Sequence, residues 1–237
     1  MFFNKYYSLA FMITIPAFLF GQNPNLNYNK FKQLKEEVAT PNVYRTASGA
    51  PGHQYYQNEA DYVMNIFLND QNQKLTGSET IKYHNNSPDQ LEYLWIQLDQ
   101  NKRAQNSDSY KIQTGGIRSL NSRSINDMNP EFEGGFNITA VTKKDGSPQS
   151  HTINKTMMRI NLSKPLQPGS SFSFNVNWWY NINNRMEIGG RSGYEYFKEE
   201  DNYLYTIAQF YPRMAVYNDV EGWQNKQFLG RGEFTLP

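Results

Sequence analysis

Hydrophobic and polar residues alternate with a period of two along the central part of the sequence, which is the spacing of a half-buried β-strand. In the segment from Asp61 to Ser87 the alternation runs first through Val63, Asn65 and Phe67. After the polar run NDQNQ it resumes at every second position: Leu75, Gly77, Glu79, Ile81 and Tyr83. Two alternating segments joined by a short polar run predict a β-hairpin.

The residues that follow predict further short strands. LEYLWIQLDQN, from Leu91 to Asn101, has the composition of a buried strand, and two more strands flank the turn from Pro165 to Gly169. The segment NITAVTKKDGSPQSHTI predicts another hairpin, with Asp145-Gly146 as its turn. Short strands without strand–helix–strand alternation predict an all-β fold, either an antiparallel β-sandwich or a large curved sheet.

The first residues have the layout of a signal peptide. Lys5 precedes an apolar run from Leu9 to Phe20, and Gly21 then begins a polar stretch. The apolar run is shorter than the roughly 20 residues that a membrane-spanning helix needs. We therefore expect residues 1–21 to be removed after Gly21 on export to the periplasm, the cell surface or the medium. An uncleaved membrane anchor is the alternative, because Leu19 is not small.

Residues 22–57 are polar and predict a linker, with a short helix possible from Lys30 to Val38 that Thr40-Pro41 would end. Residues 58–237 carry the strand patterns and predict the folded domain. No segment after the leader is apolar and long enough to cross a bilayer.

Composition agrees with a folded domain and excludes one class of partner. Aromatic residues make up 15% of the chain, which is far more than a disordered sequence carries. Lys and Arg total 23 against 22 Asp and Glu, so a net charge of +1 provides no general attraction for nucleic acid. The sequence contains no Cys, which excludes disulfides.

The usual catalytic and cofactor motifs are missing from the sequence. His53, His84 and His151 have neither a Glu nor a second His at helical spacing, and without Cys they predict no metal site. No Ser lies in a G-x-S-x-G elbow, and no glycine pattern is typical of nucleotide binding. The run Glu199 to Asp201 lies in a polar stretch and indicates a solvated turn.

One aromatic cluster, NWWYN from Asn177 to Asn181, is compatible with ligand binding, because exposed rings stack on sugars and other flat ligands. In a strand, however, Trp178 and Trp179 point to opposite faces, one into the core and one into an interface. A free-standing glycan- or protein-binding β-sandwich therefore stays open as an alternative function.

Four segments in this order resemble the N-terminal domain of the M1 family of zinc aminopeptidases, in the form found in secreted bacterial members. They are the opening hairpin, the strand LEYLWIQLDQN, the pair INLSKPLQPGSSFSFNVNWWY and the segment YTIAQFYPRMAVYNDVEGWQNKQFLGRGEFTLP. The similarity covers Asn58 to Pro237. In that family the first domain is a saddle-shaped β-sandwich that precedes a thermolysin-like catalytic domain, and the resemblance implies the same for this chain.

The resemblance also implies one site residue. Family members carry a Gln, followed two positions later by Glu or Gln, that reaches the free amino end of the substrate, and Gln209 falls on the first of these positions. Tyr211 falls on the second, where an amide or a carboxylate is expected, so a packing role for Gln209 also stays open. Asp219 resembles an Asp that is structural in the family.

Phe228, Phe234 and Leu236 among polar residues predict the start of a strand at the end of the sequence. The family's His-Glu-x-x-His helix, distal Glu ligand and Gly-x-Met-Glu-Asn strand have no counterpart here. We therefore expect this chain to be part of a longer gene product, to contain no catalytic or metal-binding residue, and to be inactive alone. The resemblance implies that the full-length protein packs this domain on its catalytic domain, binds one zinc there through two His and one Glu, and cleaves peptide substrates.

Overall fold

The computed structural model describes residues 41–111, 132–188 and 192–230. The chain divides between His53 and Gln54 into two compact units. In the first unit the described residues form an antiparallel bridge between Arg45 and Pro51, and all strands named below belong to the second. The predicted signal peptide at 1–21, the helix at 30–38 and the residues around Phe234 and Leu236 lie outside the described residues.

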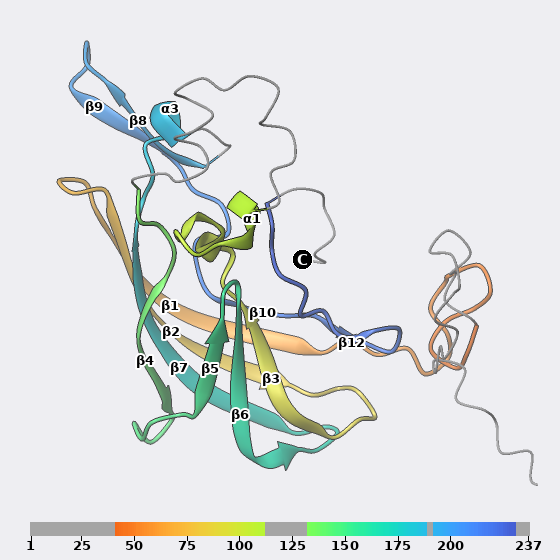
Figure 1. The fold of residues 1–237 in the computed structure, drawn as a ribbon. Helices are drawn as coiled ribbons and strands as arrows, with labels where there is room; N and C mark the ends of the chain where they lie inside the picture. The colour runs from red at the N-terminus through yellow and green to blue at the C-terminus, as the bar shows by residue number, and fades with distance from the viewer. Residues whose placement is uncertain (1–40, 112–131, 189–191, 231–237) are drawn as a thin grey trace, which may run out of the picture. The chain divides into compact units, whose positions relative to one another are not determined.

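Four antiparallel strands form the first sheet, in the order β1-β2-β7-β4 (Figure 1). Their bounds are β1 (Glu59–Asn69), β2 (Lys74–His84), β7 (Ser171–Asn181) and β4 (Asn137–Lys143). β1 and β2 form the predicted hairpin, with Asn69 opposite Lys74 across the turn. On β2 the alternate positions from Leu75 to Tyr83 are all buried, as their spacing predicts.

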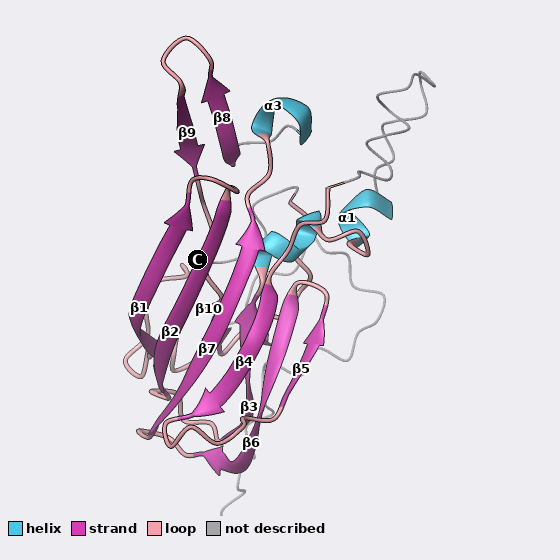
Figure 2. Ribbon diagram, turned by 90° about the vertical axis from the view of Figure 1, so that its left-hand side faces the viewer, coloured by secondary structure: helices cyan, strands magenta, loops and turns pink. Residues whose placement is uncertain are grey.

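The second sheet has the order β10-β3-β6-β5, and all of its pairs are antiparallel (Figure 2). Its strands are β10 (Arg213–Met214), β3 (Leu91–Gln97), β6 (Met157–Leu166) and β5 (His151–Asn154). β6 continues to Leu166, two residues into the turn predicted from Pro165 to Gly169, and the residues that follow lead the chain to β7 in the other sheet. The prediction of an all-β antiparallel sandwich is therefore confirmed.

Two hairpins and three short helical segments complete the described elements. The hairpins are β8 (Gly193–Phe197) with β9 (Asn202–Thr206), and β11 (Tyr217–Asn218) with β12 (Gly222–Trp223). The helical segments are the 3-10 helix η2 (Asp99–Arg103), α1 (Asp108–Lys111) and α3 (Arg185–Ile188). None of the described helices has the length and apolar character needed to cross a membrane.

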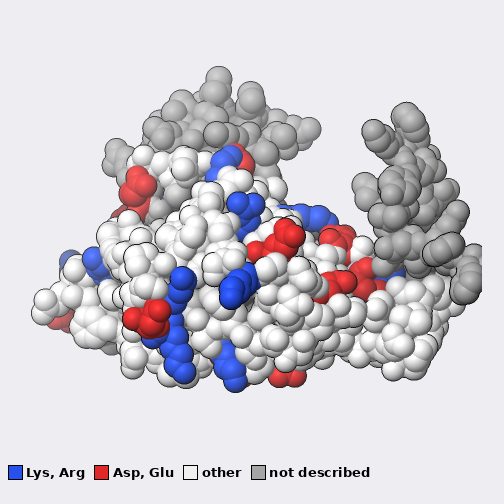
Figure 3. All heavy atoms as spheres, turned by 90° about the horizontal axis from the view of Figure 1, so that it is seen from below, with Lys and Arg blue, Asp and Glu red and all other residues white. Residues whose placement is uncertain are grey.

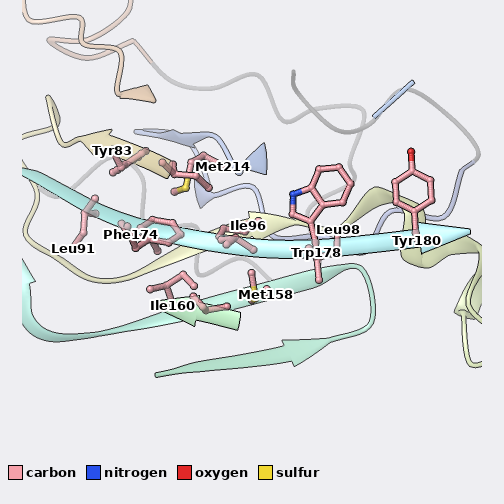
Figure 4. Packing of buried hydrophobic residues seen from close by; sticks show 14 of the residues in the cluster. Tyr83, Leu91, Ile96, Leu98, Met158, Ile160, Phe174, Trp178, Tyr180 and Met214 are labelled. Atoms are coloured by element: carbon pink, nitrogen blue, oxygen red, sulfur yellow. The ribbon is translucent and has the colours of Figure 1, made fainter. Parts of the chain in front are cut away.

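Apolar side chains from both sheets meet in one core (Figure 4). β7 contributes Phe174, Val176, Trp178 and Tyr180 from alternate positions, and β3 and β6 face them with residues that include Ile96, Met158 and Ile160. The Trp178 ring lies 5.9 Å from that of Tyr180 in a stacked arrangement. Because β7 pairs with β2 on one side and β4 on the other, its side chains lie at the centre of the sandwich.

The strand predicted from Leu91 to Asn101 is too long at its C-terminal end. β3 ends at Gln97, and the chain turns into η2 at Asp99. The side chain of Asp99 accepts a hydrogen bond from the Arg213 guanidinium on β10, and that of Gln100 donates to the carbonyl oxygens of Ala208 and Gln209, which lie before β10. These contacts, over more than 100 positions in sequence, end the strand.

The hairpin predicted around Asp145-Gly146 is present but short: Thr142 forms an antiparallel bridge with Pro148, and the Gln149 N–H donates to the Val141 carbonyl oxygen. The turn is present, and Gly146 has a φ of 83°, which glycine adopts readily. However, β4 pairs with β7, whereas β5 pairs with β6 in the other sheet. The Gln149 side chain donates a 2.7 Å hydrogen bond to the Asn161 carbonyl oxygen, which holds the chain at the point where it crosses between sheets.

Gly77 has no side chain at the point where the Trp178 ring crosses β2. A Cβ atom built on Gly77 would overlap the indole of Trp178, its direct partner on β7. We expect Gly77→Ala to force this ring aside and to lower the free energy of unfolding by about 1–3 kcal/mol, the usual cost of overpacking a core. Thermal unfolding measures the loss. Ser78→Ala, on the opposite face of β2, is the control, and an equal loss in both variants would contradict the packing argument.

Glu79 lies on the buried face of the same strand. Its side chain is 3% exposed, and within the described part of the chain neither carboxylate oxygen has a hydrogen-bond partner. Burial raises the pKa of this carboxyl from 4.5 to about 9. Glu79 is therefore protonated in the folded protein at neutral pH but ionised in the unfolded chain.

This difference predicts a pH dependence of stability. Between pH 4.5 and 9 the folded state binds more protons than the unfolded state, so stability is full below pH 4.5 and falls as the pH rises. The slope from this group approaches about 1.4 kcal/mol per pH unit. In Glu79→Gln this part of the slope disappears. Unfolding curves of both proteins from pH 5 to 9 check this, and parallel curves would show that Glu79 does not titrate as described.

Candidate functional site

Gln209, the candidate substrate-binding residue, lies in the segment between β9 and β10. Its side chain is exposed and makes no hydrogen bond to any described residue. Its backbone has a φ of 52°, in the left-handed region that residues other than glycine seldom adopt. Such a conformation persists only where neighbouring contacts hold it, and it is found disproportionately at functional sites.

Those contacts come from η2. The Gln100 side chain is 4% exposed, and its amide nitrogen donates to the carbonyl oxygens of Ala208 at 2.9 Å and Gln209 at 3.1 Å. Its amide oxygen accepts a 2.9 Å hydrogen bond from Nη1 of Arg103. We call Gln100 and Arg103 with these two carbonyl groups the Gln100 clamp. It fixes the backbone of Gln209 and leaves the side chain of that residue free to meet a ligand.

A buried ion pair holds the other end of the segment. Nε of Arg213 lies 3.0 Å from Oδ2 of Asp99. Burial raises the pKa of the Asp99 carboxyl, and the charge of Arg213 opposes that rise. Burial also lowers the pKa of Lys102 on the same helix, as does the charge of Arg103. The residues of η2 thus hold the segment from Ala208 to Arg213 at both of its ends.

Tyr211 packs where a carboxylate or an amide was expected. It is half-buried, and its ring meets that of Tyr62 on β1 edge-on at a centroid distance of 5.4 Å. The Tyr62 hydroxyl in turn accepts a 2.8 Å hydrogen bond from the backbone N–H of Met214. Tyr211 therefore attaches the segment to the first sheet. Asp219 lies in the turn between β11 and β12 and is half-buried.

The three histidines lie in separate places. His53 is exposed in the first unit. His84, at the end of β2, contacts Asp61 and Ser171 across the first sheet. His151 begins β5, and its Nδ1 lies 3.0 Å from the Gln149 carbonyl oxygen. Among the described residues, no three His, Asp or Glu side chains are grouped so that they could hold a metal ion.

The other sequence candidates have structural positions. Glu199 and Asp201 lie in the exposed turn between β8 and β9, as predicted, and Asp201 accepts a 2.7 Å hydrogen bond from the Tyr196 hydroxyl. Trp178 is buried in the core, whereas Trp179 points to the opposite face of β7. There the ammonium group of Lys74 lies 3.6 Å from the centre of the Trp179 ring. Trp178 therefore presents no face for stacking, and one face of the partly buried Trp179 ring is covered by Lys74.

Charged side chains of both signs are interspersed on the side of the molecule seen in Figure 3. That side therefore carries no extended field of one sign.

Sequence reasoning missed the Gln100 clamp, because Gln100 and Gln209 are 109 positions apart. The only local signal was the polar run DQNKR directly after an apolar strand, where the side chains of Asp99, Gln100 and Arg103 are nevertheless buried.

Comparisons with known proteins give structural neighbours only. No protein-family model matches the sequence, and no curated protein matches it. Solved structures that resemble it include M1 zinc metallopeptidases. One, from Deinococcus radiodurans, is 12% identical, with a TM-score of 0.36 over 61% of this chain and 25% of that chain.

Mutant forms give similar values. One bound to the substrate Tyr-Ser-Ala, also from Deinococcus radiodurans, is 10% identical, with a TM-score of 0.34 over 57% of this chain and 23% of that chain. Another, a two-domain enzyme bound to L-tryptophan, is 11% identical with the same TM-score and the same coverage. This chain spans about a quarter of the length of these structures. At this degree of similarity the matches carry no inference about activity.

The clamp predicts that the amide of Gln100 is required to order Gln209. In Gln100→Glu the shape is kept and Arg103 retains an acceptor, but a carboxylate cannot donate to the two carbonyl groups. We expect a loss of about 1–3 kcal/mol in the free energy of unfolding, together with faster hydrogen exchange of the Met214 amide, which donates to the Tyr62 hydroxyl at the end of this segment. The control is Gln71→Glu in the exposed turn between β1 and β2. Unchanged exchange at Met214 would show that Gln100 does not hold this segment.

Proposed function

We propose that this chain is the N-terminal, non-catalytic β-sandwich of an exported M1-like zinc aminopeptidase. As a full-length protein, the enzyme would remove N-terminal residues from peptides. The observation that carries the proposal is Gln209, which occupies the family's substrate-binding position by resemblance and is exposed on a clamped, left-handed backbone. The antiparallel sandwich and the order of the resembling segments support it.

The described residues of this chain could not hold the zinc ion of such an enzyme, because no three of their His, Asp and Glu side chains lie close enough together to bind a metal. Two His and one Glu of a catalytic domain outside this chain would hold it, and this chain would pack on that domain and form one wall of the cleft. A zinc ion supplies an activated water to such an enzyme when it is bound. What this chain would add is recognition of the substrate's amino end.

Gln209 suits that role chemically. Its amide oxygen can accept a hydrogen bond from the ammonium group of a peptide, and such a charge-assisted contact contributes about 1.5–3 kcal/mol when water is excluded. Because the Gln100 clamp already fixes the backbone, little ordering entropy is lost on binding. Tyr211 supplies no negative charge beside it, so recognition in this protein would rest on a neutral amide.

Kinetics of the full-length protein test the role of Gln209. Gln209→Ala should lower kcat/KM for an aminoacyl p-nitroanilide roughly 10- to 100-fold if the contact strengthens toward the transition state. The control is Gln71→Ala, which removes an exposed amide in a turn. Both variants are first shown to unfold at the temperature of the parent. Unchanged kcat/KM in folded Gln209→Ala would remove the residue from the site.

The wider proposal has its own test. Full-length protein should hydrolyse the anilide, lose that activity on dialysis against a chelator, and regain it with zinc. Absence of any aminopeptidase activity in zinc-loaded, folded protein would overturn the assignment to this family.

Mass spectrometry of the exported product should find Gln22 as its first residue, whereas an intact Met1 would indicate an anchor.

A further inference from the structure

A groove of about 410 Å³ lies on the outer face of the first sheet, whose strands lie side by side in Figure 2. This volume lies within the range of about 300–1,000 Å³ that is typical of ligand sites. The outward-pointing side chains that line it are Asn65, Phe67, Thr76, Ser78, Thr139 and Asn177. They belong to all four strands of the sheet, so the groove crosses the strands.

Three residues form a row across the floor of this groove. Asn65 on β1 lies opposite Ser78 on β2, which lies opposite Asn177 on β7. We call them the amide row. None of their side chains makes a hydrogen bond to another described residue, so their donors and acceptors are available to a ligand.

The next row on the same face differs in this respect. Thr80 on β2 donates a 2.7 Å hydrogen bond to the Asn175 amide oxygen on β7, and the Asn175 amide nitrogen donates to the Thr142 hydroxyl on β4 at 3.3 Å. These polar groups satisfy one another within the sheet. Asn175 and Asn177 thus lie two positions apart on the same face of β7. Only Asn177 lines the groove with a side-chain amide that makes no hydrogen bond to a described residue.

An open aromatic ring flanks the amide row on its other side. The Phe67 side chain is 64% exposed at the edge of the sheet. Trp179 belongs to the same row of residues, but it is partly buried and the Lys74 ammonium group lies over one face of its ring. The most open ring beside the amide row is therefore that of Phe67, rather than either tryptophan of the NWWYN segment.

The chemistry of the lining favours one class of ligand. None of the lining residues is ionisable, so a charged ligand would find no counter-charge in the groove. Amides and hydroxyls in a row beside an exposed ring match a neutral sugar, which offers hydroxyl groups to the first and a C–H face to the second. An extended peptide would bind the free edge of β1 through its main chain and would not need the amide row.

We propose that the amide row and Phe67 form a binding site for a neutral oligosaccharide of two or three units. The site is built within the sandwich and does not depend on the aminopeptidase proposal. It would give the exported protein a means of attachment to a neutral polysaccharide.

The test titrates the purified chain with maltotriose, cellotriose and triacetylchitotriose by calorimetry at millimolar concentration. At least one trisaccharide should bind. Asn177→Ala and Phe67→Ala should each weaken that binding roughly tenfold or more, whereas Asn175→Ala should change it by less than about twofold. Asn175 and Asn177 are a matched pair on one strand and one face, and thermal unfolding confirms that each variant is folded.

Three results would overturn the proposal. They are the absence of binding by all three sugars, equal weakening by Asn175→Ala and Asn177→Ala, and binding of a neutral hexapeptide that is tighter than that of any sugar. Activity of the full-length protein toward anilides is measured separately. Failure of the sugar-binding proposal therefore does not affect the aminopeptidase proposal, and the reverse also holds.

Discussion

Burial of one face of β7 is the constraint on which the rest of the structure depends. β7 pairs along its whole length with β2 and over much of it with β4, and its inner side chains fill the space between the sheets. Gly77 has to be without a side chain to make room for Trp178. Because side chains alternate along a strand, fixing Trp178 inside also fixes Asn177 and Trp179 on the outside. The core thereby determines what the outer face can present.

A second set of contacts connects the core to the candidate site around Gln209. After Leu98 the chain buries polar side chains instead of apolar ones, and each of these needs a partner. Gln100 finds its acceptors in Ala208 and Gln209, and Asp99 finds Arg213. A buried amide with its hydrogen bonds formed is specific in geometry as well as stabilising. Hence a segment without long strands of its own is held in a defined, strained conformation.

The sequence predicts the features that depend on the local alternation of apolar and polar residues. It does not predict which strands pair when they are far apart in the sequence. The β1–β2 hairpin and the strands around Pro165 follow from alternation and turn residues, because both act over a few positions. The separation of β4 and β5 into different sheets does not follow, because a turn at Asp145-Gly146 is compatible with either pairing. For the site, resemblance marked Gln209, but nothing local marks Gln100, since its polarity alone indicates a surface position.

The same limit applies to the aromatic cluster on β7. A pair of tryptophans is conspicuous in sequence, yet Trp178 is buried in the core and a lysine on the neighbouring strand lies over one face of Trp179. What remains open is composed of ordinary residues, Asn65, Ser78 and Asn177, which come together only through the register of three strands. Two asparagines on β7 differ in their hydrogen bonds, although they are two positions apart and chemically identical. Availability of a polar group for a ligand is therefore a property of its neighbours across the sheet, and it can be read only once the strand pairing is known.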